Sequence, residues 1–290
     1  MRVFVTGATG FVGSAVVREL RRAGHGVLGL SRSAAGAAAL EAAGAEALRG
    51  DLEDLASLRQ GAAAADGVIH LAFGHDFTRF AESCAIDERA IAVLGGALEG
   101  SGRTLVVTSG VGLLAHGRPA TEQDRPQGMF PRASERAASA FIGKGVNVAI
   151  VRLAQVHDTA RQGFVSRLVG LYREKGECAV IGNGANRWSA VPVGDAAVLY
   201  RLALELGAPE AVYHAVAEEG VALRDIADTV AARLGLPTRA IEPDQAEAYF
   251  GMLAMFAALD MSADSTATRL ALGWQPAGRG LLDDLRELQI

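Results

Sequence analysis

Three glycines lie three residues apart near the start of the chain, in the run Thr6-Gly7-Ala8-Thr9-Gly10-Phe11-Val12-Gly13. Each suits one need of a phosphate-binding turn: Gly7 permits a sharp turn, Gly10 leaves room for a pyrophosphate, and Gly13 lets a helix pack closely on a strand. A short apolar run precedes the turn and a helical pattern follows it, so free N–H groups would face the phosphates. The motif predicts a dinucleotide site with contacts at Gly7, Thr9, Gly10, Phe11, Val12 and Gly13. The alternative is a glycine-rich turn that binds no ligand.

The second predicted strand, over 26–31, ends in Ser31-Arg32-Ser33. A site that selects NAD usually has a carboxylate here, which binds the 2′-hydroxyl of the ribose, and this segment has none. A guanidinium between two hydroxyls suits a 2′-phosphate better. We therefore expect NADP(H) to be preferred over NAD(H). The alternative is that Arg32 is a solvated loop residue and that the site accepts either cofactor.

The residue pattern of the glycine motif, Thr-Gly-x-x-Gly-x-x-Gly, resembles that of the short-chain dehydrogenase/reductase superfamily. It is most similar to the extended, epimerase/dehydratase-like branch. Later segments carry the resemblance along most of the chain. It implies a Rossmann-type fold with a C-terminal substrate lobe that is discontinuous in sequence. It also implies cofactor contacts at the ends of two further strands, at Asp51 and Leu52 near the adenine and at Leu71 and Ala72. Asp51 can at the same time cap the next helix.

The residues that move the proton in this superfamily, a Tyr and a Lys four residues later on one helix, are missing. No tyrosine has a Lys at that spacing; the four are Tyr172, Tyr200, Tyr213 and Tyr249. The segment 130–138 resembles the family's helix, with Pro131 in place of the Tyr and Glu135 in place of the Lys. In a register shifted by one residue, Arg132 and Arg136 take the two places. Arginine keeps its proton but can hold a cofactor phosphate or ribose, or polarise a carbonyl. The alternative is an ordinary amphipathic helix with a solvated charged face.

The fifth predicted strand ends at Thr108 and Ser109, where the resemblance implies a hydroxyl that binds the substrate oxygen. We expect Ser109 to donate this hydrogen bond, with Thr108 as the second candidate; a serine that satisfies its own turn is the alternative. A histidine can supply the proton at neutral pH. His75, which follows the fourth strand beside Asp76, is the first candidate, and His157, after the sixth strand, is the second. Either can instead be an ordinary loop or core histidine.

The segment 186–195 resembles the turn that lines the substrate pocket in extended members of the superfamily. Trp188 can stack on a flat substrate, although packing within the lobe is the alternative. Asp195 is expected to cap the helix that follows. Position alone suggests the remaining apolar pocket residues, which are Phe77, Met129 and Phe130.

The elements that must position these residues alternate between strand and helix, which predicts an α/β fold with a doubly wound parallel sheet. We expect strands over 2–6, 26–31, 45–49, 67–72, 103–108 and 147–153. The helices between them are expected over 11–23, 34–42, 53–62, 78–98 and 131–144. Later we expect helices over 161–175 and 194–206 and a strand over 211–216. Residues 1–155 then form the dinucleotide-binding domain and 156–290 mostly a substrate-side lobe, with parts of 190–216 returning to the sheet.

The chain has 290 residues, half of them apolar, and a net charge of −5. This charge favours neither nucleic acid nor an anionic membrane as a partner, and no apolar run has the length of a membrane span. Cys84 and Cys178 lie far apart without metal-ligand spacing, so we expect no metal site and a cytoplasmic location. The expected partner is a small-molecule substrate. The resemblance adds a homodimer, for which the predicted helices over 78–98 and 131–144 are the candidate surface.

Three functions fit these residues. The first is an NADP(H)-dependent oxidoreductase that transfers hydride between the nicotinamide and a carbonyl or alcohol of a small, fairly apolar substrate. The second is a non-redox isomerase, dehydratase or lyase on the same scaffold, which the missing Tyr and Lys keep open. The third is a non-catalytic NADP(H) sensor, against which Ser109 and the two histidines weigh.

Overall fold

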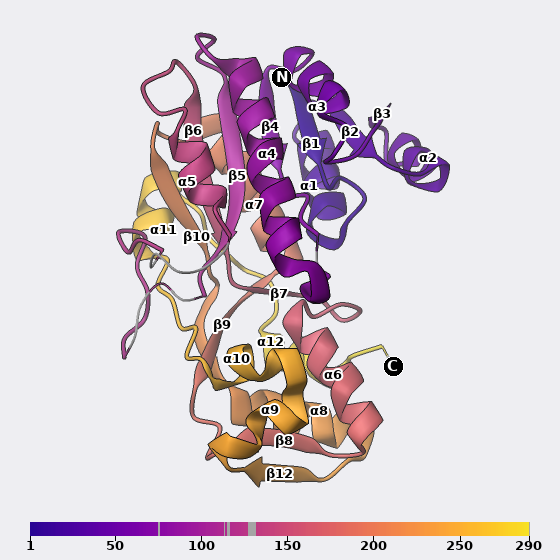
Figure 1. The fold of residues 1–290 in the computed structure, drawn as a ribbon, viewed down its shortest axis with the longest axis vertical. Helices are drawn as coiled ribbons and strands as arrows, with labels where there is room; N and C mark the ends of the chain where they lie inside the picture. Colours follow the sequence, from indigo (N-terminus) through magenta and orange to yellow (C-terminus); the bar gives the residue numbers. More distant parts are fainter. Residues whose placement is uncertain (75, 113, 115–116, 127–131, 290) are drawn as a thin grey trace.

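The computed structural model describes residues 1–289 except 75, 113, 115–116 and 127–131, and its first half alternates strand and helix (Figure 1). The strands are β1 (Arg2–Thr6), β2 (Gly26–Ser31), β3 (Glu46–Arg49), β4 (Gly67–His70), β5 (Thr104–Gly110) and β6 (Asn147–Leu153). The helices are α1 (Phe11–Arg22), α2 (Ala34–Ala42), α3 (Leu55–Ala63), η1 (Phe77–Arg79), α4 (Phe80–Leu98) and α5 (Ser134–Ser139).

Seven parallel strands form the central sheet in the order β10-β6-β5-β4-β1-β2-β3. The strand β10 (Ala211–Ala215) joins from the second half of the chain and pairs with β6. The strand order reverses between β1 and β4, which is the point where open α/β sheets bind ligands at the carboxyl ends of their strands. The predicted Rossmann-type, doubly wound α/β fold is confirmed.

The side chains of β1 explain why both faces of the sheet are covered, because successive residues of a strand point to opposite faces. Val3 and Val5 belong to the core that contains α1 and α7 (Val193–Leu206). Phe4 belongs to a separate core with α3 and α4. The central strand is therefore buried on both sides.

The predicted helix over 131–144 is wrong in length, because α5 covers only Ser134–Ser139. After it the chain continues in tight turns whose N–H groups bond to carbonyls three residues earlier. Gly143 and Gly145 take φ angles of +77° and +72°, which end any helical continuation. Phe141 packs into the core beneath α4.

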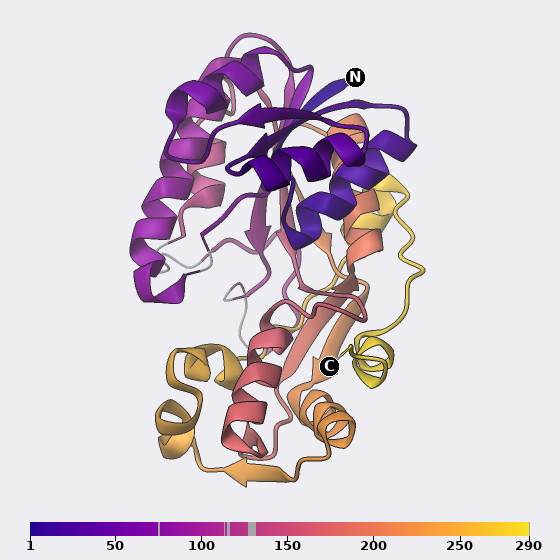
Figure 2. The ribbon, with the colours of Figure 1, turned by 90° about the vertical axis from the view of Figure 1, so that its right-hand side faces the viewer.

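The second half of the chain forms a lobe beyond the carboxyl edge of the sheet, drawn below it in Figures 1 and 2. One small sheet contains β7 (Gln155–His157), β9 (Arg187–Pro192) and β11 (Glu218–Ala222), and another contains β8 (Cys178–Ile181) and β12 (Thr238–Ile241). The helices of the lobe are α6 (Phe164–Lys175), α8 (Leu223–Leu234), η2 (Pro243–Gln245), α9 (Ala246–Phe250), η3 (Gly251–Leu253), α10 (Ala254–Ala258) and α12 (Leu281–Arg286). Most of these elements share an apolar core of their own, whereas Val156 of β7 packs into the core of the large sheet.

Three elements of the second half, α7, β10 and α11 (Thr266–Leu272), return to the seven-stranded sheet. Within the described parts of the chain, no helix is both long and apolar enough to cross a membrane.

Candidate cofactor and substrate site

The glycine turn between β1 and α1 is held by contacts that leave no room for side chains. Gly7 has a φ of +68°, and a Cβ there would lie 2.8 Å from the backbone nitrogen of Ala72. A Cβ on Gly13 would lie 2.0 Å from the carbonyl oxygen of Gly7. The N–H of Gly10 donates to that same oxygen at 2.9 Å. The turn thus brings β1, the start of α1 and the segment after β4 into direct contact.

The start of α1 has no side-chain cap, because its N-cap residue is Gly10. The first N–H groups of a helix have no partner within the helix, and they carry a partial positive charge. Phe11, Val12 and Gly13 line the same cavity as Gly7, Thr9 and Gly10. This end of the cavity therefore suits an anion.

The cavity has a volume of about 1000 Å³ and runs from the glycine turn along the carboxyl edge of the sheet into the lobe. Figure 2 shows the lobe facing this edge. Its walls include the ends of β1, β4 and β5 and, on the lobe side, residues of β7, β9, α6 and α10. For each described residue that the sequence analysis proposed, the question is therefore whether it lines this one cavity.

The end of β2 is built differently from the expectation. Arg32 is exposed and lines the cavity, but Ser31 and Ser33 do not. Ser31 is buried and donates from Oγ to the carbonyl of Ser33 at 3.1 Å. Ser33 Oγ accepts from the N–H of Gly36 at 3.0 Å and caps α2. The buried hydroxyl of Ser31 is committed to the backbone, which corrects its expected role beside a 2′-phosphate, whereas the contact expected of the exposed Ser33 stays a prediction.

Arg49, at the end of β3, is a neighbour of Arg32 that the sequence analysis missed. Its Nη2 donates to the carbonyl of Arg32 at 2.9 Å, and both residues are exposed. In the parallel pairing of β2 with β3, Arg49 lies opposite Ser31. The parallel register of β2 and β3 would have predicted this neighbour. Arg32 lines this end of the cavity, and the guanidinium of Arg49 lies directly beside its backbone.

Asp51 and Leu52 also line the cavity. Asp51 Oδ1 accepts from the N–H groups of Glu53 and Asp54 at 2.8 and 2.9 Å. The N-cap of α3 is Asp54 and not Asp51. Asp51 therefore fixes the turn before the helix, and its second carboxylate oxygen has no hydrogen-bond partner among the described residues.

A chain of hydrogen bonds beneath the middle of the cavity joins four elements. His70 Nδ1 lies 2.8 Å from Thr6 Oγ1, and His70 Nε2 lies 3.1 Å from Asp87 Oδ1. Ser134 Oγ donates to Asp87 Oδ2 at 2.5 Å, and Arg132 Nε donates to Ser134 Oγ at 2.9 Å. Burial works to raise the pKa of Asp87, but the hydrogen bond and charge of His70, with Arg132 and Ser134, lower it overall. This network fixes Arg132.

Arg132, which the sequence analysis proposed as a cofactor contact, lines the cavity, and its Nη2 donates to the carbonyl of Thr108 at 3.1 Å. Its guanidinium carbon lies 4.2 Å from the centroid of the Phe73 ring, which also lines the cavity. Leu71 and Ala72, just before Phe73, line it too. A fixed positive charge therefore stands where β4 and β5 end.

Arg136 does not line the cavity, which corrects its expected role. Its side chain is 77% exposed and pairs with Glu88 at 3.0 Å. Glu135 does line the cavity and holds Arg152 through two hydrogen bonds of 2.8 Å. The residue in the position of the family's Lys is thus an anion whose charge is balanced by the fully buried Arg152.

The two hydroxyls at the end of β5 have different surroundings. Thr108 Oγ1 donates to the carbonyl of His70 at 2.7 Å and lies 2.8 Å from the hydroxyl of Tyr200. Thr108 lines the cavity, but its hydroxyl is committed to the fold, which corrects its expected role as a donor to substrate. Ser109 lines the cavity, and its Oγ has no hydrogen-bond partner among the described residues. Ser109 is the hydroxyl available to a ligand.

No tyrosine is among the described residues that line the cavity. Tyr200 is fully buried, and this burial raises its pKa. Tyr172 is fully buried as well, and its hydroxyl donates to the carbonyl of Ala179 at 2.9 Å. The missing Tyr of the sequence motif is therefore not replaced by a tyrosine from another described segment.

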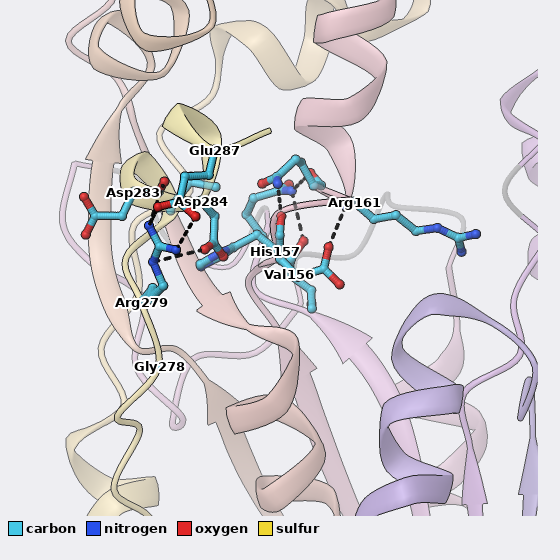
Figure 3. Close-up of polar contacts among 12 residues, drawn as sticks. Val156, His157, Arg161, Gly278, Arg279, Asp283, Asp284 and Glu287 are labelled. Carbon is cyan, nitrogen blue, oxygen red and sulfur yellow. Dashed lines mark hydrogen bonds and ion pairs between the residues drawn. The ribbon is translucent and has the colours of Figure 1, made fainter. Parts of the chain in front are cut away.

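The structure does not support His157 as a proton donor to a ligand, because this residue is fully buried and does not line the cavity. Figure 3 shows it among polar residues of the C-terminal segment. His157 Nδ1 lies 2.7 Å from Asp284 Oδ2 of α12, and its Nε2 lies 4.0 Å from Glu218 Oε2. Arg279 in turn pairs with Glu287 at 2.7 Å. His157 thus links β7 to α12 within the lobe.

Four of the predicted residues cannot be placed, since His75, Met129 and Phe130 lie outside the described residues and the side chain of Phe77 is not described. Gly74 and Asp76, on either side of His75, both line the cavity. Among the described residues, no three His, Cys, Asp or Glu side chains gather to hold a metal ion.

The lobe end of the cavity has aromatic and apolar walls. Phe164 and Phe256 stack with ring centroids 4.7 Å apart, and Trp188 and Met261 line the same space. Trp188 is only 1% exposed, and its Nε1 has no hydrogen-bond partner among the described residues. Trp188 therefore belongs both to the lobe core and to the cavity wall.

Asp195 does not cap α7, whose N-cap is Pro192. Its Oδ2 accepts from the N–H groups of Ala277 and Gly278 at 3.1 and 2.8 Å. Its carbonyl accepts from Trp274 Nε1 at 3.0 Å. Asp195 thus holds the chain that leads to α12 against the sheet, which corrects its expected role.

The fold and the glycine-lined cavity define a Rossmann-type protein of the dinucleotide-binding kind. The chain belongs to the NAD dependent epimerase/dehydratase family, whose model matches residues 3–216. It is 43% identical to an uncharacterised protein of Schizosaccharomyces pombe over 98% of both chains. It is 41% identical to one of Saccharomyces cerevisiae, over 99% of this chain and 98% of that protein. A third relative is 28% identical over 60% of this chain and 56% of its own length. It is 4-hydroxy-2-methyl-3-oxo-4-farnesyl-3,4-dihydroquinoline-1-oxide ketoreductase of Stigmatella aurantiaca.

Solved structures share the fold over nearly the whole chain. DesIV, a dTDP-glucose 4,6-dehydratase from Streptomyces venezuelae, superposes with a TM-score of 0.79 at 21% identity, over 99% of this chain and 96% of that chain. The UDP-glucose 4-epimerase of Thermus thermophilus gives 0.75 at 23% identity, over 99% and 97%.

Proposed function

We propose that this protein is an NADP(H)-dependent oxidoreductase that transfers hydride between the nicotinamide and a carbonyl or alcohol of a small, fairly apolar substrate. The observation that carries the proposal is the continuous cavity, with the glycine turn at one end, Ser109 and Arg132 in the middle and an aromatic wall in the lobe. A dinucleotide and a second molecule can share a space of this kind.

The residues at the glycine end fit a dinucleotide. The close approaches at Gly7 and Gly13 exclude a side chain at both positions, and the uncapped start of α1 attracts phosphate. The structures of the dehydratase and of the epimerase both hold NAD, which supports a nicotinamide dinucleotide here. Arg32 with Arg49, and no carboxylate at the end of β2, favours the 2′-phosphate of NADP(H).

Ser109 and Arg132 are proposed to act on the substrate oxygen. The hydroxyl of Ser109, which has no partner among the described residues, donates a hydrogen bond to the carbonyl, and the fixed charge of Arg132 stabilises the oxygen as it becomes negative. The bound cofactor supplies the hydride. His75 is proposed to supply the proton, since both of its neighbours in the chain line the cavity.

One relative supports the redox direction, because it is named as a ketoreductase of a farnesylated quinoline oxide. The second candidate is a non-redox dehydratase or epimerase, which the family and the two solved structures favour. The two candidates differ in their net consumption of cofactor. A reductase consumes one NADPH for each product formed, whereas a non-redox enzyme leaves the amount of NADPH unchanged.

The test is a screen of the purified protein with NADPH and, in parallel, with NADH against ketones, aldehydes and enones. Loss of the reduced nicotinamide absorbance together with one equivalent of alcohol or saturated carbonyl is expected, and faster with NADPH. Substrate conversion without loss of absorbance would overturn the redox proposal in favour of the second candidate. Tight binding of NADPH with no conversion across the panel would point to a sensor.

A further inference from the structure

A second hollow, of about 430 Å³, opens beside the lobe end of the cavity. It lies between the start of α4 and the α9–α10 segment, which are on the same side of the molecule in Figure 2. We call it the annex; its walls are Phe80, Glu247, Gly251, Met252, Ala254, Met255 and Phe256. Phe80 and Phe256 line both the annex and the cavity. The two spaces therefore share an aromatic wall.

The outer wall of the annex exposes apolar side chains that most surfaces would bury. Met252 is 53% exposed and Met255 is 50% exposed. They are two of only five large apolar side chains that are exposed in the described part of the chain. Methionine is flexible and polarisable, and it adapts to apolar ligands of irregular shape. Ligand grooves are among the sites where exposed apolar side chains gather, and these two methionines adjoin the cavity.

The charge of the annex limits the chemical groups that it can bind. Glu247 is the one ionisable side chain among its described walls, and no Lys, Arg or His accompanies it. A carboxylate or phosphate at this place would meet an anion and no cation, whereas a neutral hydrocarbon would bury the two methionines and the aromatic rings.

We propose that the annex binds the neutral, extended apolar tail of the substrate, an alkyl or prenyl chain whose carbonyl end lies at Ser109. This inference rests on the proposed function for the position of the carbonyl. The tail passes the Phe164 and Phe256 stack, where the lobe wall is already apolar, and ends against Met252 and Met255. The substrate is thus a long molecule with one polar end, rather than a compact polar one.

The test uses 2-alkanones from butanone to tetradecanone with NADPH and compares kcat/KM along the series. Each methylene that enters the annex is expected to raise kcat/KM roughly two- to fourfold until the tail fills it. Met255→Glu is expected to lower the ratio of kcat/KM for 2-dodecanone to that for 2-butanone about tenfold, because the chain then meets a second carboxylate. Leu270→Glu, at an 81% exposed position on α11, is the matched control and should leave the ratio unchanged.

Calorimetry separates this inference from the redox proposal. The same alkanones are titrated into the NADP⁺-saturated protein, or into the protein alone if it binds no nucleotide. The annex is supported if alkanone affinity rises with chain length in the parent protein but not in Met255→Glu. This result would hold even if no ketone is reduced. Affinity that is flat along the series, or a rise that Met255→Glu leaves intact, would overturn the annex while leaving the hydride transfer to its own test.

Discussion

The two ends of the cavity are built in opposite ways. The glycine end is made of short stretches that follow β1, β2, β3 and β4, and at its centre lies backbone, where a single added Cβ at Gly13 would overlap a carbonyl oxygen. The lobe end is made of large side chains, Phe164, Trp188, Phe256 and Met261, that come from four separate segments. The shape of the glycine end thus depends on fixed backbone geometry, and the shape of the lobe end depends on the volume of side chains.

This difference predicts how each end responds to mutation. A change in the glycine turn disturbs β1, α1 and the β4 end together, so it affects folding and cofactor binding at once. A change in the lobe wall alters the shape of a space and should change substrate choice more than cofactor affinity. The predictions below separate the two ends.

The largest effect is expected from Gly13→Ala. The new Cβ would lie 2.0 Å from the carbonyl oxygen of Gly7, so α1 must move away from the turn. We expect a loss of about 1–3 kcal/mol in the free energy of unfolding and no measurable NADPH binding, by denaturation and titration calorimetry. Gly170→Ala is the control, because a Cβ in that part of α6 meets nothing within 4 Å and should stabilise the protein by about 0.5–1 kcal/mol. Unchanged NADPH affinity in Gly13→Ala would remove the cofactor site from this turn.

Ser109→Ala tests the middle of the cavity. Loss of one donor to a developing oxyanion is expected to lower kcat about 10²- to 10³-fold while the Kd for NADPH stays the same. Thr108→Val is the comparison variant, because its hydroxyl bonds to the His70 carbonyl and to Tyr200. That variant should lose about 1–3 kcal/mol of stability. A normal kcat in Ser109→Ala would show that the substrate oxygen binds elsewhere.

Arg32→Ala tests the choice of cofactor at the far end of the glycine turn. Removal of a charged donor from a phosphate is expected to cost about 1.5–3 kcal/mol in NADPH binding, which is about a ten- to hundredfold weaker Kd, with little change for NADH. Arg49→Ala should act in the same direction. Equal losses for both nucleotides would contradict recognition of the 2′-phosphate.

The smallest effect concerns His214, a fully buried residue that supports the sheet behind the cavity. Burial is the main cause that lowers its pKa, and Arg152 Nη1, 3.3 Å from Nε2, acts in the same direction. Below the ordinary histidine pKa of about 6.5, the unfolded chain therefore binds a proton that the folded protein does not. The free energy of unfolding should fall as the pH drops from about 6.5 towards the lower folded value, by up to about 1.4 kcal/mol per pH unit for this group.

His214→Asn removes that contribution. The variant should lose stability at pH 8, where the Nδ1 contact with the carbonyl of Asp264 at 2.7 Å is disturbed. Its unfolding free energy should nevertheless fall less steeply between pH 6.5 and 5 than that of the parent. Urea denaturation at several pH values measures both slopes, and parallel slopes would mean that His214 has the same pKa in the folded and the unfolded state.

Parts of the site that depend on neighbouring residues in the chain could be predicted from the sequence. The glycine turn, Arg32 at the end of β2 and Ser109 at the end of β5 all line the cavity, because parallel strands bring their carboxyl ends to one edge. Ser31 and Ser33 could not be judged in this way, since their hydroxyls have nearby backbone groups to satisfy. Local motifs predict where a residue lies better than they predict its partner.

Residues whose surroundings come from distant segments could not be predicted. From the sequence, His157 was a candidate proton donor or an ordinary loop or core histidine, and only the contact with Asp284 of α12, 127 positions later, shows that it is buried in the lobe. Arg132 and Arg136 were predicted together, but only Arg132 lines the cavity, because the short helix α5 packs against α4 and β5 where the prediction assumed a longer helix over 131–144. Tertiary contacts of this kind leave no periodic pattern in the sequence.

The most direct test of the central claim is transfer of deuterium from NADPH that carries the label at the reactive carbon of the nicotinamide. The protein is incubated with the labelled cofactor and the carbonyl panel, and products are weighed by mass spectrometry. Hydride transfer to the substrate predicts a product that is heavier by one deuterium. Product that carries no deuterium, formed while the labelled NADPH stays reduced, would contradict the account and assign the scaffold to non-redox chemistry.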